Sequence, residues 1–224
     1  MKILFLSDFH LGSPLFKSED KIFSLLNDEY DMIFLLGDII DTWEGSLWSI
    51  INDNAPLLRE LNALPNLVVI KGNHDPDLDD LNRVFPGKEV SMDYEFEDNG
   101  KKGIVVHGDE FDHMVTRYSW IARLVWPINW ILERAGINIK AFFRETYHSL
   151  AAKREKKYYN DLILTVEKEL VNKYKDGYDY IVIGHTHLPK LIVEDDYTYV
   201  NCGDWVHNQT YVIYEDNNFR LVEV

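Results

Sequence analysis

The sequence predicts an α/β fold, built as a single domain of residues 1–224 with one helical insertion. Short apolar segments of three to five residues alternate with amphipathic segments whose apolar residues recur at helical spacing. The 224 residues are enough for one sizeable core and too few for two ordinary domains. A basic, aromatic stretch breaks the alternation, and we interpret it as an insertion.

Ten segments are expected to be strands. Five of them are rich in Ile, Leu, Val and Phe, as strands buried on both faces tend to be: Ile3–Leu6, Met32–Leu36, Leu67–Ile70, Ile104–Val106 and Tyr180–Ile183. Five more have turn residues at their ends: Val90–Glu97, Leu191–Glu194, Tyr197–Val200, Tyr211–Tyr214 and Phe219–Val222. Helical periodicity predicts helices over Lys17–Asn27 and Leu47–Leu64.

Residues 111–175 differ from the rest of the chain in charge. They hold 12 Lys and Arg against seven Asp and Glu, so they carry +5 and leave −20 on the remainder of a chain whose net charge is −15. Their apolar residues recur at helical spacing, which predicts one helix through about Arg134 and a longer one over about Ile139–Lys173. The segment also holds three tryptophans: Trp120, Trp126 and Trp130.

Composition argues against a membrane-spanning, a secreted or a nucleic-acid-binding protein. No stretch approaches the roughly 18 apolar residues of a membrane span, and Ile3–Leu6 is too short for the core of a signal peptide. The single cysteine, Cys202, cannot form an internal disulfide, which fits a reducing compartment. We therefore expect a cytoplasmic protein. Its net charge of −15 argues against a long nucleic acid as partner.

Each of the five apolar core segments is followed at once by side chains that can bind metal. Ligands of open α/β sheets bind outside the carboxyl ends of the strands, so these side chains are expected to converge on one crevice. In chain order they are Asp8 and His10; Asp38 and Asp41; Asn73, His74 and Asp75; His107 and Asp109; and His185 and His187.

These clusters form five ordered motifs that resemble the calcineurin-like metallophosphoesterase family across essentially the whole chain. Any one of them recurs by chance, but five in order, each after an apolar strand, do not. The resemblance implies a two-sheet α/β/β/α sandwich with residues 111–175 as a helical cap. The motifs are Asp8-x-His10, Gly37-Asp38-x-x-Asp41, Gly72-Asn73-His74-Asp75, His107-Gly108-Asp109 and Gly184-His185-Thr186-His187.

The resemblance implies a pair of divalent metal ions. One would be bound by Asp8, His10, Asp38 and His187, and the other by Asp38, Asn73, His107 and His185. Mixed imidazole and carboxylate donors suit manganese, iron or zinc better than magnesium, and we expect manganese first. Two such ions can activate one water for attack on phosphorus.

The resemblance also implies roles beside the metals. His74 would protonate the leaving group or stabilise the transition state, and Asp75 would orient its ring. Asp41 and Asp109 would lie behind the ligands and hold them in place.

Four local features resemble the branch of UDP-2,3-diacylglucosamine pyrophosphohydrolases of lipid A biosynthesis: the aromatic helical insertion, the segments His107–Asp112 and Asn201–Val206, and the motif Gly184–Pro189. In that branch the cap holds acyl chains while the metals direct water onto a pyrophosphate. The resemblance makes four cap residues candidates for substrate binding and for peripheral contact with the inner face of the cell membrane: Arg117, Trp120, Arg123 and Trp126.

The substrate stays open at this stage. Well-characterised members of the branch have Arg at the position of His74, and tryptophans at helical spacing are also typical of an ordinary helix core. The alternative is a soluble phosphodiesterase of nucleotides or other small phosphate esters, with the insertion as a lid or a dimer surface. A scaffold that has lost its metals, like the retromer subunit, is disfavoured because no ligand is missing. The oligomeric state is not predicted.

Overall fold

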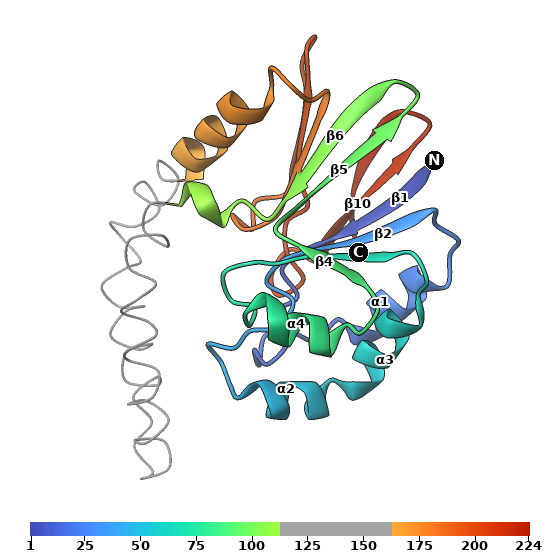
Figure 1. Cartoon of the computed structure of the whole chain (residues 1–224), viewed down its shortest axis with the longest axis vertical. Coiled ribbons are helices and arrows are strands. Elements are labelled where there is room, and N and C mark those ends of the chain that lie inside the picture. Colours follow the sequence, from blue (N-terminus) through green and yellow to red (C-terminus); the bar gives the residue numbers. More distant parts are fainter. Residues whose placement is uncertain (113–162) are drawn as a thin grey trace. The chain divides into compact units, whose positions relative to one another are not determined.

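The computed structural model describes residues 1–112 and 163–224 (Figure 1). The chain divides into two compact units, one of Met1–Asp109 with Val171–Val224 and the other of Glu110–Leu170. Residues 163–174 are helical, close to the predicted end at Lys173. None of the helices in the two described ranges is long and apolar enough to cross a membrane.

The first sheet has six strands in the order β11-β10-β1-β2-β3-β4. Its first four strands in sequence run parallel, and β10 and β11 complete it as antiparallel strands. The bounds are β1 (Lys2–Leu6), β2 (Met32–Leu36), β3 (Leu67–Ile70), β4 (Glu89–Ser91), β10 (Thr210–Glu215) and β11 (Asn218–Glu223).

The second sheet has five strands in the order β5-β6-β7-β9-β8. Its centre, β6-β7-β9, is parallel, and an antiparallel strand closes each side. The bounds are β5 (Asp93–Asp98), β6 (Lys101–Val106), β7 (Tyr180–Ile183), β8 (Lys190–Val193) and β9 (Thr198–Asn201).

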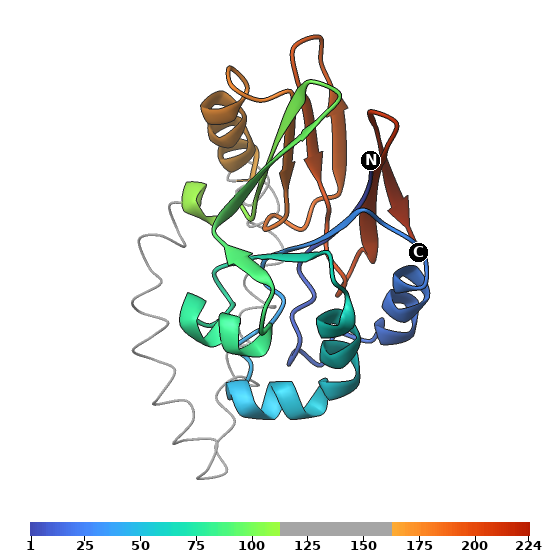
Figure 2. The ribbon, with the colours of Figure 1, turned by 45° about the vertical axis from the view of Figure 1, so that its right-hand side comes forward.

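The first sheet is buried on both faces, because alternate residues of β1 enter two different cores. Ile3 and Phe5 lie in a core shared with the second sheet, where Phe5 stacks on Phe34 of β2 with ring centroids 5.2 Å apart. Leu4 and Leu6 lie in a core shared with the helices α1 (Glu19–Leu26), α2 (Leu47–Asp53), α3 (Ala55–Ala63) and α4 (Leu78–Val84). These helices gather on one side of the first sheet (Figures 1 and 2). The predicted α/β fold with two sheets is confirmed.

Two local predictions needed correction, and one helix was missed. The predicted helix Leu47–Leu64 is two helices, because Asn54 leaves helical geometry at φ −113° and Pro56 opens α3. The predicted strand Val90–Glu97 is also two elements, since the chain leaves the first sheet after β4 and enters the second at β5. Helix α4 was not predicted, although the side chain of Asp77 caps its first turn.

We expect Gly103→Ala to lower the free energy of unfolding by about 1–3 kcal/mol, because a methyl group there overpacks the core. A Cβ on Gly103 would overlap the ring of Phe96, its partner across β5 and β6, which is itself buried against Tyr180 and Tyr214. Urea unfolding followed by circular dichroism measures the change. The control is Gly177→Ala, whose Cβ would lie 3.9 Å from its nearest neighbour. Equal stability of the two variants would contradict this packing.

Candidate metal centre

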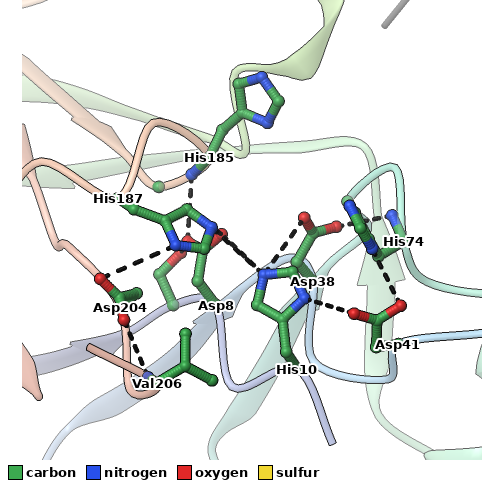
Figure 3. Close-up of polar contacts among 12 residues, drawn as sticks. Asp8, His10, Asp38, Asp41, His74, His185, His187, Asp204 and Val206 are labelled. Carbon is green, nitrogen blue, oxygen red and sulfur yellow. Dashed lines mark hydrogen bonds and ion pairs between the residues drawn. The ribbon is translucent and has the colours of Figure 1, made fainter. Parts of the chain in front are cut away.

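The polar clusters of the sequence converge where the parallel strands of both sheets end (Figure 3). Backbone hydrogen bonds tie the loops together: the amide of Asp8 donates to Gly37 O at 3.1 Å, and that of Gly184 to His107 O at 3.2 Å. The amide of Trp205 donates to Asp8 O at 3.1 Å. The loops after β1, β2, β6 and β7 and the segment after β9 therefore form one framework.

The backbone is strained at this framework. Nine described residues other than glycine have positive φ, a region that costs most side chains energy. Five of the nine belong to the predicted ligand set, with φ between 49° and 64°: Asp8, His10, Asp38, His185 and His187. Such strain persists only where the surrounding structure imposes it, and it clusters at functional sites.

One group of donor atoms is formed by Asp8, His10 and His187, whose ligand atoms lie within 4.8 Å of one another. The Nε2 atoms of His10 and His187 are 3.2 Å apart, and both face Asp8 Oδ1, at 3.8 and 3.1 Å. Three lone-pair donors thus surround one small space.

A second group is formed by Asp38, His107 and His185 within the same limit of 4.8 Å. Asp38 Oδ2 lies 3.4 Å from His107 Nε2 and 3.9 Å from His10 Nε2, so it faces both groups. Its other oxygen accepts the backbone amide of His74 at 2.7 Å, which fixes the carboxylate between them.

The donor set fits metal ions. Three buried atoms of predicted ligands have no hydrogen-bond partner: Asp8 Oδ1, Asn73 Oδ1 and His107 Nε2. His187 lies within ion-pair distance of Asp8 Oδ1 without making a hydrogen bond to it. A buried polar atom without a partner costs about 1–3 kcal/mol, and a bound cation would remove that cost by accepting the lone pairs.

The far sides of these ligands are held by other groups. The second oxygen of Asp8 accepts hydrogen bonds from the Ser7 hydroxyl and, at 3.1 Å, from the backbone amide of His185. His107 Nδ1 donates to Leu36 O at 2.7 Å, so this tautomer leaves the lone pair of Nε2 for a metal. The contact of His10 Nδ1 with Asp41 Oδ2, at 2.8 Å, has the same effect.

Our interpretation of Asp75 needs correction. Asp41, not Asp75, holds the ring of His74, because Asp41 Oδ1 lies 2.9 Å from His74 Nδ1. The oxygens of Asp75 accept backbone amides from Ile40 at 2.8 Å and Gly72 at 2.9 Å. Asp75 therefore fastens the loop after β2 to the loop after β3.

Buried histidines and carboxylates shift one another's pKa values at this site. Burial would lower the pKa of His10, but the hydrogen bond with Asp41 and the neighbouring carboxylates of Asp8 and Asp38 outweigh it and raise that pKa to about 11. Burial acts likewise on His107, where the charge of Asp38 raises the pKa to about 10. Burial would raise the pKa of Asp8 and Asp38, but the neighbouring histidines hold both below the usual value. Protons on histidines thus balance the buried carboxylates when no metal is bound.

Other predicted residues fall outside this geometry or at its margin. Asp109 begins the 3-10 helix η1 (Asp109–Phe111), and its charge contributes to the raised pKa of His107. Four predicted substrate-binding residues lie outside the described residues: Arg117, Trp120, Arg123 and Trp126.

Sequence reasoning missed two residues at the site. Asp204 is fully buried, with Oδ2 3.8 Å from His187 Nδ1; the motif Asn201–Val206 was noted, but without a role for this carboxylate. Trp43 stacks on His74, with ring centroids 4.0 Å apart and planes 28° apart. No spacing or motif in the sequence signals that stack.

Solved structures similar to this chain share its fold. An archaeal phosphodiesterase has a TM-score of 0.55 at 18% identity, and the phosphoesterase Yfce from E. coli has a TM-score of 0.55 at 14%. Both matches cover 100% of each chain. Vps29 from Chaetomium thermophilum has a TM-score of 0.53 at 11% identity, covering 100% of this chain and 96% of that one.

Sequence comparison identifies the family. No curated protein matches the chain. A family model described as calcineurin-like phosphoesterase matches residues 1–189, and the described part of that range contains the donor groups of the site. The chain therefore belongs to the calcineurin-like phosphoesterase family, and it is a metal-dependent phosphoester hydrolase.

Proposed function

We propose that the chain hydrolyses phosphodiester or pyrophosphate bonds at a dinuclear metal centre. The observation that carries the proposal is the set of buried, unpartnered donor atoms on Asp8, Asn73 and His107. The first metal would be bound by Asp8, His10, Asp38 and His187. The second would be bound by Asp38, Asn73, His107 and His185. The distances of Asp38 Oδ2 to His10 Nε2, 3.9 Å, and to His107 Nε2, 3.4 Å, support a role for Asp38 in both ligand sets.

The chemistry of the donors favours manganese, iron or zinc. Four of the seven proposed ligands are histidines, whereas magnesium prefers sites made of oxygen ligands. When bound, two such ions lower the pKa of a shared water and neutralise charge on the phosphate. The chain's own residues orient the groups around that water. Ser7 and Asp41 fix Asp8 and His10, while Leu36 O fixes His107.

His74 is proposed to act on the leaving group. Asp41 holds its Nδ1, and its Nε2 makes no hydrogen bond within the described part of the chain. From that position Nε2 can deliver a hydrogen bond or proton to the departing oxygen, a role typically worth about 10²–10⁴ in rate.

The lipid-linked candidate is UDP-2,3-diacylglucosamine, which would be cleaved at its pyrophosphate to release UMP. It is supported by the motifs His107–Asp112, Gly184–Pro189 and Asn201–Val206, and by the basic, aromatic composition of residues 111–175. On this proposal those residues form a cap within a single domain and contact the cytoplasmic face of the membrane. The soluble alternative, small phosphodiesters, is supported by His74, which can donate a proton where Arg would only hold charge.

Hydrolysis with added manganese tests both the proposed hydrolase activity and the proposed lipid-linked substrate. In detergent, wild type should hydrolyse bis-p-nitrophenyl phosphate, and Asp38→Asn should lose at least about 100-fold in activity because both metals lose an anionic ligand. Asp79→Asn, an exposed substitution in α4, is the control and should retain activity. Release of UMP from UDP-2,3-diacylglucosamine would support the lipid substrate, and cleavage of the diester alone would remove it. A metal-loaded wild type that cleaves neither compound would contradict the proposed function.

Metal binding should release protons. At pH 7 the metal-free protein carries protons on His10 and His107, whose pKa values are raised to about 11 and 10, and each ligand must lose its proton to bind. Affinity should therefore rise with pH from 6 to 8, with at least about two protons released per protein, because the pKa of His187 is raised as well. Titration calorimetry in buffers of different ionisation enthalpy measures the number. A binding enthalpy independent of the buffer would argue against this protonation state.

Gly72→Ala should weaken metal binding by at least about 10-fold. A Cβ at Gly72 would overlap Asp38 and approach His107 Nε2 to 2.9 Å, so the shared carboxylate would be displaced. Gly45→Ala is the matched control, because its Cβ would lie 3.6 Å from Ile50, an ordinary contact. The check is metal content after dialysis, together with calorimetric affinity. Equal metal affinity in the two variants would show that the site tolerates the displacement.

A further inference from the structure

The loop that follows β2 wraps around His74 in a way that metal binding does not require. Thr42 donates twice to His74 O, from its backbone amide at 3.1 Å and from its hydroxyl at 2.7 Å. The next residue, Trp43, lays its ring over the imidazole at a centroid distance of 4.0 Å. Consecutive residues thus hold the backbone and the ring of one histidine.

Asp41 couples these contacts. Its Oδ1 atom is 2.9 Å from His74 Nδ1 and accepts the backbone amide of Trp43 at 3.0 Å. One oxygen therefore holds the backbone of Trp43 and the imidazole of His74 together. On another side, the ring of His10 meets that of His74 edge-on, with centroids 4.8 Å apart.

Trp43 is not a core residue. It is only half-buried and belongs to neither hydrophobic core, whereas Trp205 is fully buried in one of them. The side chain of His74 remains 22% exposed, so without the stack its ring would have room to turn. Holding a reacting group in one orientation removes an entropic cost from the chemical step.

We propose that Trp43 and Thr42 are positioning residues, which hold His74 with Nε2 directed at the leaving group. The inference rests on the proposed role of His74 and names the residues that make it effective. Trp43 covers a ring face, His10 flanks the ring and Asp41 occupies Nδ1, so the Nε2 edge is left for substrate.

The test compares two aryl diesters of similar shape, bis-p-nitrophenyl phosphate and diphenyl phosphate. Phenolate is the poorer leaving group and depends more on Nε2. Trp43→Ala should lower kcat about 10-fold or more on diphenyl phosphate and no more than about threefold on the nitrophenyl ester, with metal content unchanged. Trp43→Phe keeps an aromatic face and should restore kcat, whereas Trp43→Leu should behave like Trp43→Ala.

Two comparisons separate positioning from a structural effect. Trp48→Ala removes a tryptophan that is 80% exposed in the neighbouring α2, and it should match wild type on both esters. Thr42→Val removes the hydroxyl bond to His74 O and should show the same selective loss as Trp43→Ala, which Thr42→Ser should reverse. In a His74→Ala background, Trp43→Ala should cost nothing further, since a residue that acts through another is not additive with it.

Any of three outcomes would overturn the inference. Trp43→Ala could lower kcat equally on both esters, or Trp43→Leu could keep the wild-type ratio of kcat on the two esters. In the His74→Ala background, Trp43→Ala could still lower kcat as much as it does in the wild-type protein. These outcomes leave the proposed function intact, because wild type would still hydrolyse both esters. A metal-loaded wild type that cleaves neither ester would overturn the proposed function and this inference together.

Discussion

Two buried carboxylates constrain everything around them. Asp8 and Asp38 are 0% and 2% exposed, and an ionised carboxylate at such depth is tolerated only where opposite charge lies beside it. The chain surrounds them with histidines, which hold protons when metal is absent and offer lone pairs when it is present. Folding, protonation and metal binding are therefore linked through the same few atoms.

The architecture accepts local strain to keep these carboxylates together. Five site residues sit at positive φ, and Gly72 has no room for a side chain beside Asp38. Parallel strands packed on both faces, with rings such as Phe5 and Phe34 stacked between the sheets, supply the rigidity that holds the loops in place. Ser7 bonds to Leu36 O at the end of β2, and Asp75 bonds to the amides of Ile40 and Gly72, so the strain is spread over a connected framework.

The sequence predicts the strands and the clusters that follow them, because burial on two faces leaves a continuous apolar run and the polar residues start where it stops. The sequence does not show which group a polar side chain will bond to. Asp75 adjoins His74 in sequence but bonds to backbone amides, whereas Asp41, 33 residues away, holds that ring. The sequence also does not show where a helix breaks. The helical spacing of apolar residues in Leu47–Leu64 continues through Asn54, and the packing of two short helices decides the break.

One carboxylate joins the two functions of the site. Asp41 contacts His10 through Oδ2 and His74 through Oδ1, so a ligand of the first proposed metal and the group proposed to meet the leaving oxygen share a support. A change at Asp41 would disturb both at once. Trp43 and Thr42 contact His74 itself, through the ring stack and through hydrogen bonds to His74 O. The orientation of His74 therefore depends on these two residues as well as on Asp41.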